Sequence, residues 1–349
     1  MSQHETYMKR CIELAQMGMG LVSPNPMVGA VVVCDNRIIG EGYHMSFGEA
    51  HAEVNAIRNV VDTYPDAEHL LKRSTIYVSL EPCSHFGKTP PCADLIINNQ
   101  IPRVVVGCRD PFEQVDGKGM EKLKAAGVEV IEGVLEDECK VLNKRFNTRV
   151  QKQRPYIILK WAQSKDGFFA PADGSQKWIT SSLAKQLVHR WRSEEDAVLI
   201  GKNTALADNP QLNVREWSGQ NPVRIIVDRN LELNKELHIF DQSQDTIIFN
   251  ALKTELVGKI KYLELEGFDN LLPQLICYQL YLMDIQSVMI EGGEKMLNLF
   301  LSAGLWDEAR VFTGPVLWSK GMQSPIMMSQ PLETIVIGPD ILQIWQNGL

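Results

Sequence analysis

Helical and extended patterns alternate along almost the whole chain, and this alternation restricts the fold more than any other feature. In the first 150 residues, strands are expected at 28–34, 37–43, 75–80, 103–107 and 128–131. Helices are expected at 4–18, 51–61, 92–99, 118–126 and 136–150. Such an order is typical of a sheet covered by helices on both faces. The sequence therefore predicts an α/β fold.

The same alternation starts again after the polar segment QKQRP at 151–155, which is the best candidate for a domain boundary. Further strands are expected at 156–161, 197–201, 223–227, 246–249, 287–290 and 308–312, and helices at 182–192, 270–282 and 295–303. A chain of 349 residues is long for one domain. We expect two α/β domains, over residues 1–148 and 149–349.

Charge and composition argue against several classes of protein. The formal net charge of −8 opposes binding to DNA or RNA unless a local basic groove exists. The chain has neither an apolar run of about 18 residues, as a membrane span requires, nor the basic and apolar segments of a secretory signal. Seven cysteines without tight spacing do not resemble a disulfide framework. We expect a cytoplasmic protein whose thiols can bind metal.

The strongest chemical motif is HAE at 51–53 followed by PCSHFGKTPPC at 82–92. A catalytic zinc ion needs three protein ligands and an open position for water, and His51, Cys83 and Cys92 supply such a set. Pro91 suits the first position of a helix, which places Cys92 where the helix dipole favours a thiolate. The sequence therefore predicts one catalytic zinc ion per chain.

Glu53 has the role of the glutamate in zinc deaminases that moves protons without binding the metal. It cannot share a regular helix face with His51, because residues two apart diverge by about 200°, but both can reach a metal beyond the helix end. Two alternatives stay open: a purely structural zinc, and cysteines that bind no metal. His44 and His85 are interpreted as pocket residues rather than ligands.

These motifs carry a resemblance to a known family. PNPMVGAVVV, GYHMSFGEAHAEVNAI, LEPCSHFGKTPPC and GCRDP resemble the deaminase half of the RibD family of bifunctional riboflavin biosynthesis enzymes. The eight residues between the two cysteines suit this family rather than cytidine deaminases of the usual kind. The resemblance implies a cytidine-deaminase-like three-layer domain. It also implies a substrate, 2,5-diamino-6-ribosylamino-4(3H)-pyrimidinone 5′-phosphate, held by Asn25, His44 and Lys88.

A glycine pair in IEGGEKML, at 290–297, stands between an expected strand and an expected helix. Such a turn lets backbone N–H groups approach a pyrophosphate, although paired glycines usually form only a turn. No GxGxxG motif follows a strand, so a Rossmann domain is not predicted. With KWAQSKDGFFA, KWIT and HRWRSEEDAVLIGKNTALADNPQLNVR, this segment resembles the NADPH-dependent, dihydrofolate-reductase-like half of the RibD family.

The resemblance implies that this half reduces the ribosyl group of the deaminated product to ribityl, giving 5-amino-6-ribitylamino-uracil 5′-phosphate. The residues implied to contact NADPH are Ala162, Trp178, Thr204, Asp208, Gly292 and Gly293. Those implied to hold the second substrate are Lys160, Arg192, Leu212, Arg215 and Glu291. Lys160 and Glu291 are the catalytic candidates, as groups near the carbon that accepts hydride.

The chain departs from the family pattern at Gln176, where a serine is expected, and at Asn209, where a second aspartate is usual. These differences leave the details of substrate contact open, and residues 230–269 receive no assignment. The family implies a homodimer joined through the reductase domains. Two other hypotheses remain: a base-editing deaminase with an RNA-binding second half, and a scaffold protein in which one site has lost its chemistry. Against the first, the chain is acidic and its second half has reductase-like motifs.

Overall fold

The structure is a computed structural model that describes residues 2–84, 90–112, 116–172 and 178–348. The chain divides into two compact units, Met1–Gln153 and Arg154–Leu349. The division lies just beyond residues 148–149 because helix α7 (Lys144–Lys152) continues past that point. Each unit has its own sheet and its own buried cores.

The N-terminal unit is built on one five-stranded sheet. Its elements are α1 (Gln3–Gln16), β1 (Gly29–Cys34), β2 (Arg37–Tyr43), α2 (Ala52–Thr63), α3 (Ala67–Leu71), β3 (Thr75–Leu80), α4 (Cys92–Asn98), β4 (Arg103–Cys108), α5 (Lys118–Ala125), β5 (Glu129–Ile131), α6 (Glu136–Leu142) and α7. The strand order is β2-β1-β3-β4-β5. β1 runs antiparallel to β2 and β3, whereas β3, β4 and β5 are parallel.

Helices cover both faces of this sheet, as β1 illustrates. All six β1 residues are buried, because successive side chains of a strand point to opposite faces. Ala30 and Val32 belong to the core that contains residues of α2, α4 and α5. Val31 and Val33 belong to the core formed with α1 and α6. The three-layer, cytidine-deaminase-like arrangement is thus confirmed.

The prediction of one helix over residues 136–150 is wrong. α6 ends at Leu142 and α7 begins at Lys144, with Asn143 at the junction in a non-helical conformation, φ −100° and ψ 24°. The side chain of Asn143 is buried and forms hydrogen bonds outside both helices. A tertiary contact therefore interrupts a segment whose local pattern favours a continuous helix.

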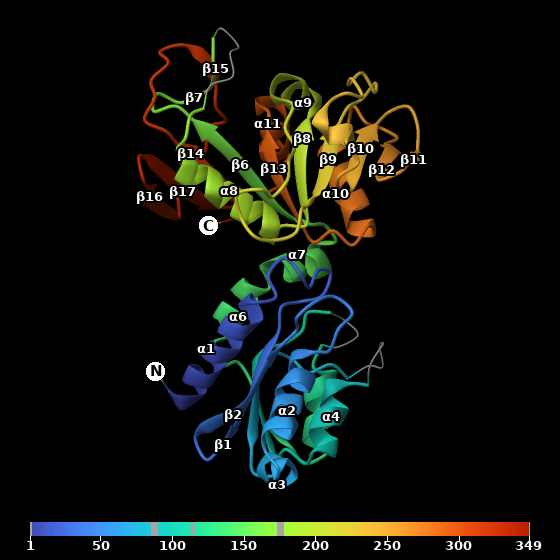
Figure 1. The fold of residues 1–349 in the computed structure, drawn as a ribbon, viewed down its shortest axis with the longest axis vertical. Coiled ribbons are helices and arrows are strands. Elements are labelled where there is room, and N and C mark those ends of the chain that lie inside the picture. The colour runs from blue at the N-terminus through green and yellow to red at the C-terminus, as the bar shows by residue number, and fades with distance from the viewer. Residues whose placement is uncertain (1, 85–89, 113–115, 173–177, 349) are drawn as a thin grey trace. The chain divides into compact units, whose positions relative to one another are not determined.

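The C-terminal unit contains a larger sheet. Its elements are β6 (Tyr156–Gln163), β7 (Phe168–Pro171), α8 (Ser182–Glu194), β8 (Ala197–Gly201), α9 (Lys202–Asp208), β9 (Val223–Val227), the 3-10 turn η1 (His238–Phe240), β10 (Thr246–Asn250), β11 (Glu255–Val257), β12 (Ile260–Glu264), α10 (Leu272–Leu282), β13 (Ser287–Gly292), α11 (Glu294–Ser302), β14 (Glu308–Thr313), β15 (Gly321–Gln323), β16 (Glu333–Ile337) and β17 (Asp340–Gln346). Ten strands pair in the order β11-β12-β10-β9-β8-β13-β6-β14-β17-β16, and β7 pairs with β15 separately (Figure 1).

The middle of this sheet, from β12 to β14, is parallel, and antiparallel strands form its two edges. One core joins the sheet to α10 and α11, and a second joins its other face to α8 and α9. The expectation of a second α/β domain is confirmed. Because parallel strands end at the same edge, the carboxyl ends of β6, β8, β9 and β13 come together there, where open α/β sheets bind ligands.

Several elements of this unit escaped the sequence analysis, namely β7, α9, β11, β12 and β15–β17. Strands β11 and β16 have mostly exposed side chains, so they lack the hydrophobic alternation from which a strand is recognised. β15 has only three residues and β7 only four. Short or exposed strands gain their pairing from neighbours rather than from local pattern.

Candidate active sites

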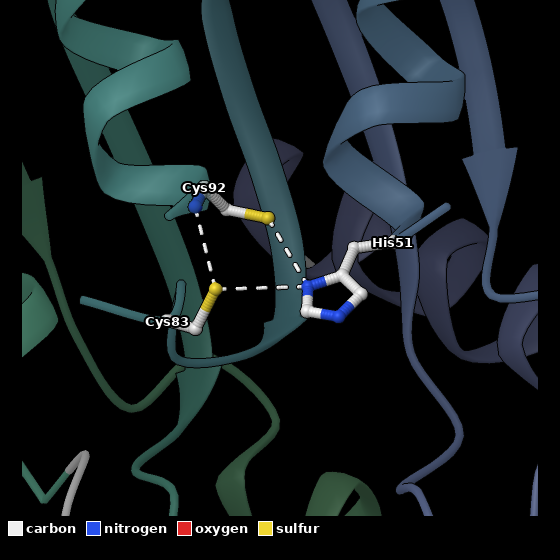
Figure 2. Close-up of side chains that lie close together, drawn as sticks. All are labelled: His51, Cys83 and Cys92. Atoms are coloured by element: carbon white, nitrogen blue, oxygen red, sulfur yellow. Dashed lines mark hydrogen bonds between the residues drawn. The ribbon is translucent and has the colours of Figure 1, made fainter. Parts of the chain in front are cut away.

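In the first unit, the three predicted zinc ligands meet where two helices begin (Figure 2). His51 is the N-cap of α2, Cys92 is the first residue of α4, and Cys83 lies in the loop between β3 and α4. His51 Nδ1 lies 3.6 Å from Cys83 Sγ and 3.3 Å from Cys92 Sγ. Their possible ligand atoms all lie within 4.8 Å of one another.

This donor set fits zinc. One imidazole nitrogen and two thiol sulfurs face a common point, which leaves a fourth position for water. The hydrogen bond with Cys92 lowers the pKa of Cys83 to about 4 and raises that of Cys92. The backbone N–H of Cys92 also donates to Cys83 Sγ at 3.3 Å. The site already stabilises one thiolate, and a bound dication would favour the second.

Glu53 lies beside this cluster, in the first turn of α2, and is only 3% exposed. His51 has an extended conformation, φ −69° and ψ 163°, because it caps the helix rather than belonging to it. Because His51 lies outside the regular helix, the side chains of His51 and Glu53 can both point toward the proposed metal position, although the two residues are only two apart in the sequence. Burial raises the pKa of Glu53 to about 7, against the opposing attraction of His51.

Asn25 and His44 form a second pair close to the cluster. Asn25 Nδ2 lies 3.0 Å from His44 Nε2, and His44 Nδ1 lies 3.0 Å from the carbonyl oxygen of Ala50. The carbonyl requires a proton on Nδ1, so Nε2 accepts from the Asn25 amide. Burial lowers the pKa of His44, which favours this neutral form. The rings of His44 and His51 are 5.7 Å apart, edge to face.

The structure therefore places the Asn25–His44 pair next to His51, and the substrate contacts that the resemblance implies for both residues stay a prediction. Lys88 and His85, the other pocket residues named from the sequence, lie outside the described residues, as does Gln176 in the second unit.

Glu81 is a buried carboxylate to which the sequence analysis gave no role, although it stands inside the LEPC motif. Its two oxygens accept four backbone N–H groups, from Asp110, Gly117, Gly119 and Met120, at 3.0–3.4 Å. It thereby ties the loop that leads to Cys83 to the start of α5. An acidic residue directly after an apolar strand was the available signal for this anchor.

In the second unit, a cavity of about 880 Å³ opens at the carboxyl ends of the central strands. A volume of this size accommodates a ligand as large as a dinucleotide. The predicted residues that line it are Lys160, Ala162, Trp178, Arg192, Thr204, Asp208, Leu212, Arg215, Glu291 and Gly293. Gly292 is not among the lining residues, but it ends β13 and forms the turn that presents Gly293.

The glycine turn needs its glycines for two reasons. Gly292 has φ +145°, a conformation that other residues rarely adopt. A Cβ atom at Gly293 would lie 2.9 Å from Thr204 Oγ1. Thr204 therefore packs directly against the turn that opens α11, which places two of the predicted cofactor residues side by side.

Three predicted substrate residues form one buried charge network. Arg192 Nε and Nη2 donate to the two oxygens of Glu291 at 2.6 and 2.9 Å, and Lys160 Nζ lies 3.7 Å from Glu291 Oε2. Burial alone would raise the pKa of Glu291, but attraction to Arg192 and Lys160 prevails and lowers it to about 2. Burial lowers the pKa of Lys160, more than Glu291 raises it.

The substitution at Asn209 has a structural explanation. Asn209 caps the end of α9 with a left-handed conformation, φ 42°, which asparagine tolerates better than most residues. Its Oδ1 accepts a hydrogen bond from the backbone N–H of His238 at 2.8 Å. The side chain fastens the loop before η1 at the rim of the cavity. Burial raises the pKa of the neighbouring Asp208.

Known protein families match both units. Residues 1–108 match the model of the cytidine and deoxycytidylate deaminase zinc-binding region, and residues 155–334 match that of the RibD C-terminal domain. The riboflavin biosynthesis protein RibD of Aquifex aeolicus is 42% identical over 325 residues, which cover 91% of this chain and 88% of that protein. RibD of Escherichia coli is 38% identical over 334 residues, covering 90% and 88%.

The chain belongs to the RibD family. RibD proteins are bifunctional enzymes of riboflavin biosynthesis, with a zinc-binding deaminase domain and an NADPH-dependent reductase domain. The base-editing hypothesis is therefore wrong, because the second unit is a RibD reductase domain rather than an RNA-binding one. Within the described residues, no helix has both the length and the apolar character to cross a membrane.

Solved RibD structures extend the likeness to the whole fold. A structure of Acinetobacter baumannii RibD matches with a TM-score of 0.89 at 35% identity, over 99% of both chains. A crystal structure of a diaminohydroxyphosphoribosylaminopyrimidine deaminase/5-amino-6-(5-phosphoribosylamino)uracil reductase from Thermotoga maritima matches with the same TM-score at 40% identity, again over 99% of both chains.

Proposed function

We propose that the first unit deaminates 2,5-diamino-6-ribosylamino-4(3H)-pyrimidinone 5′-phosphate and that the second reduces the ribosyl group of the product with NADPH. The observation that carries this proposal is the meeting of His51, Cys83 and Cys92 beside Glu53 and the Asn25–His44 pair. This arrangement provides a metal site, a group that can carry a proton and polar side chains that can bind the edge of a ring, all close together. The substrate named for the Thermotoga maritima protein supports the same assignment.

In the deaminase site, His51, Cys83 and Cys92 would hold zinc, which supplies an acidified water when bound. Glu53 would accept a proton from the attacking water, whose oxygen bonds to the ring carbon that bears the amine. Glu53 then passes the proton to the amine nitrogen as the carbon–nitrogen bond breaks, which releases ammonia. The burial of Glu53 keeps solvent from competing for this proton.

The same site contains groups suited to recognising the ring. The Asn25 side chain has a donor and an acceptor, so it can pair with one edge of the pyrimidine while His44 fixes its orientation. Lys88 is proposed to meet the phosphate, since an ammonium group is a compact partner for that charge.

In the reductase cavity, Lys160 is the proposed proton donor. Hydride adds to the first carbon of the ribosyl group, the bond from that carbon to the ring oxygen breaks, and the oxygen takes a proton. Glu291 is ionised at neutral pH and both its oxygens already accept hydrogen bonds from Arg192. We therefore assign Glu291 to orienting Lys160 and Arg192, and Arg215, which also lines the cavity, to holding the substrate.

NADPH is proposed to lie against the glycine turn, where it supplies the hydride when bound. The N-terminus of α11 opens into the cavity at Gly293, and helix N-termini favour phosphate groups. Thr204 packs on this turn. Ala162, Asp208 and Trp178 line the rest of the proposed cofactor surface.

Two further proposals concern the setting of the enzyme. All seven cysteines are free, as expected for an enzyme of the reducing cytoplasm.

The chain is proposed to form a homodimer through its reductase unit. The edge strand β16 and the segment before it expose apolar side chains, with Met328 95%, Val336 75% and Leu332 63% exposed. In sedimentation experiments, Val336→Lys should convert a wild-type dimer into monomers, and a monomeric wild type would contradict the proposal.

The test of the proposed function is a coupled assay on the purified protein with the diaminopyrimidine ribotide. Ammonia release, NADPH absorbance and zinc content are followed on the same sample. Ammonia release followed by NADPH consumption, at about one zinc per chain, supports both activities and their order. Ammonia without NADPH consumption contradicts the reductase assignment. Neither signal from a folded, zinc-loaded protein contradicts the substrate assignment.

A further inference from the structure

The junction between α6 and α7 contains a buried side chain that none of the roles above explains. Asn143 is 2% exposed. Its backbone keeps helical hydrogen bonds in both directions, donating to Cys139 O at 3.3 Å and accepting from Asn147 N–H at 2.8 Å. The local break in the helix therefore changes the direction of the Asn143 side chain without disconnecting the two helices.

This side chain pairs with both polar groups of the Met27 backbone. The Met27 N–H donates to Asn143 Oδ1 at 2.8 Å, and Asn143 Nδ2–H donates to the Met27 carbonyl oxygen at 2.9 Å. Two antiparallel hydrogen bonds fix the rotation of a residue as well as its position, as they do between paired strands. An amide supplies this donor and acceptor without introducing a charge.

Met27 is two residues from Asn25, and a restricted proline lies between them. The Asn25 backbone is held on its other side, where its N–H donates to Val22 O at 2.8 Å. The Asn25 side chain reaches His44, whose ring lies 5.7 Å from that of His51. A continuous set of contacts therefore leads from Asn143 to the residues proposed to read the pyrimidine.

We propose that Asn143 is a positioning residue for deamination: it fixes the Met27 backbone so that Asn25 faces the substrate ring. The inference rests on the proposed deaminase function and adds a residue to it. Apolar packing among Val22, Met27 and Leu142 also holds this loop against α6. Such packing is non-directional, whereas the amide pair determines how the backbone is turned.

Asn143→Ala should therefore weaken substrate binding rather than the chemical step. The Met27 N–H and carbonyl lose their partners, and the loop can turn to find others. We expect the KM for deamination to rise about tenfold, the effect of one or two lost hydrogen bonds, with kcat within about threefold of wild type. Zinc content and NADPH-dependent reduction, measured on the same protein, should stay unchanged.

A double-mutant cycle separates positioning from general stabilisation. If Asn143 acts through Asn25, then Asn143→Ala should cost little further kcat/KM in a chain that already carries Asn25→Ala. Asn143→Asp keeps the side-chain volume and one acceptor but loses the donor to the Met27 carbonyl. It should also raise KM, and it tests the proposal should the alanine variant fail to fold.

Ser74→Ala is the matched control. Ser74 is equally buried in the same unit, and its hydroxyl donates to Leu70 O at 2.7 Å, before the start of β3 and away from the site. We expect wild-type KM from this variant. Additive losses in the cycle, an equal fall in reductase activity, or unchanged KM in both Asn143 variants would each overturn the inference. A zinc-loaded wild type without deamination would instead remove the proposed function on which it rests.

Discussion

The two sites use buried polar groups in opposite ways. In the deaminase unit, His51, Cys83 and Cys92 converge on one point as a set of ligands for a cation. In the reductase unit, Arg192, Lys160 and Glu291 compensate one another within the protein. The first site is arranged to hold a cation that the protein does not itself supply, whereas in the second the protein supplies charges of both signs. Agents that remove metal should therefore separate the two activities of one chain.

Cys83→Ser should produce the largest difference between the units. Loss of one of three ligands should cost zinc and reduce deamination to background, because the acidified water is lost with the metal. NADPH binding and reduction should persist, since the cavity lies within the second unit. Zinc content, deamination and reduction are measured on the same protein. Cys34→Ser, which removes a buried thiol outside the cluster, is the control. Loss of NADPH binding in a folded Cys83→Ser protein would contradict this independence.

Glu53→Gln should abolish most deamination while the metal stays. The amide preserves shape but cannot carry a proton, and loss of a general acid–base group costs about 10²–10⁴ in rate. Zinc content, measured on the same protein, should remain at the wild-type level because Glu53 is not a proposed ligand. Substantial turnover by a zinc-loaded Glu53→Gln protein would remove Glu53 from its proton-carrying role.

Lys160→Met should affect only the second unit. Loss of the proposed proton donor should lower kcat for reduction about 100-fold, while the Arg192–Glu291 pair remains neutral and keeps the fold intact. Deamination should be unchanged. Glu291→Gln is the informative comparison, because it leaves two buried cations without compensation and should lower the free energy of unfolding by about 3–5 kcal/mol. Near-normal reduction by Lys160→Met would show that another group donates the proton.

The same contrast explains what the sequence could predict. His51, Glu53 and Cys92 stand at helix starts and Cys83 lies in the loop before the second helix. All four fall within two short motifs, so their types and spacing indicate a metal site without any long-range information. The reductase residues come from strands, helices and loops far apart in the chain, among them β6, α8, α9 and β13, and only the family resemblance joined them. Asn143 and Glu81 escaped notice because a buried amide or carboxylate acts through tertiary contacts with backbone far along the chain. The local sequence indicates only a helix around Asn143 and the end of a strand at Glu81.

The smallest expected effect concerns His189, at the edge of the charge network. His189 is buried, and its Nδ1 accepts the backbone N–H of Arg215 at 3.3 Å. Burial, together with Arg192 and Arg215, lowers its pKa to about 4. An ordinary histidine has a pKa of about 6.5, so between these values the unfolded chain binds a proton that the folded chain excludes.

The second unit should therefore lose stability as the pH falls from about 6.5 to 4. Lowering the pH favours the state that binds more protons, and in this range that is the unfolded state. His189→Gln removes this titration and should flatten that part of the profile for the second unit. The matched control is His69→Gln, which replaces an exposed histidine of the first unit with the same residue. Chemical denaturation at several pH values measures the effect. An identical slope in wild type and His189→Gln would show that folding does not lower the pKa of His189.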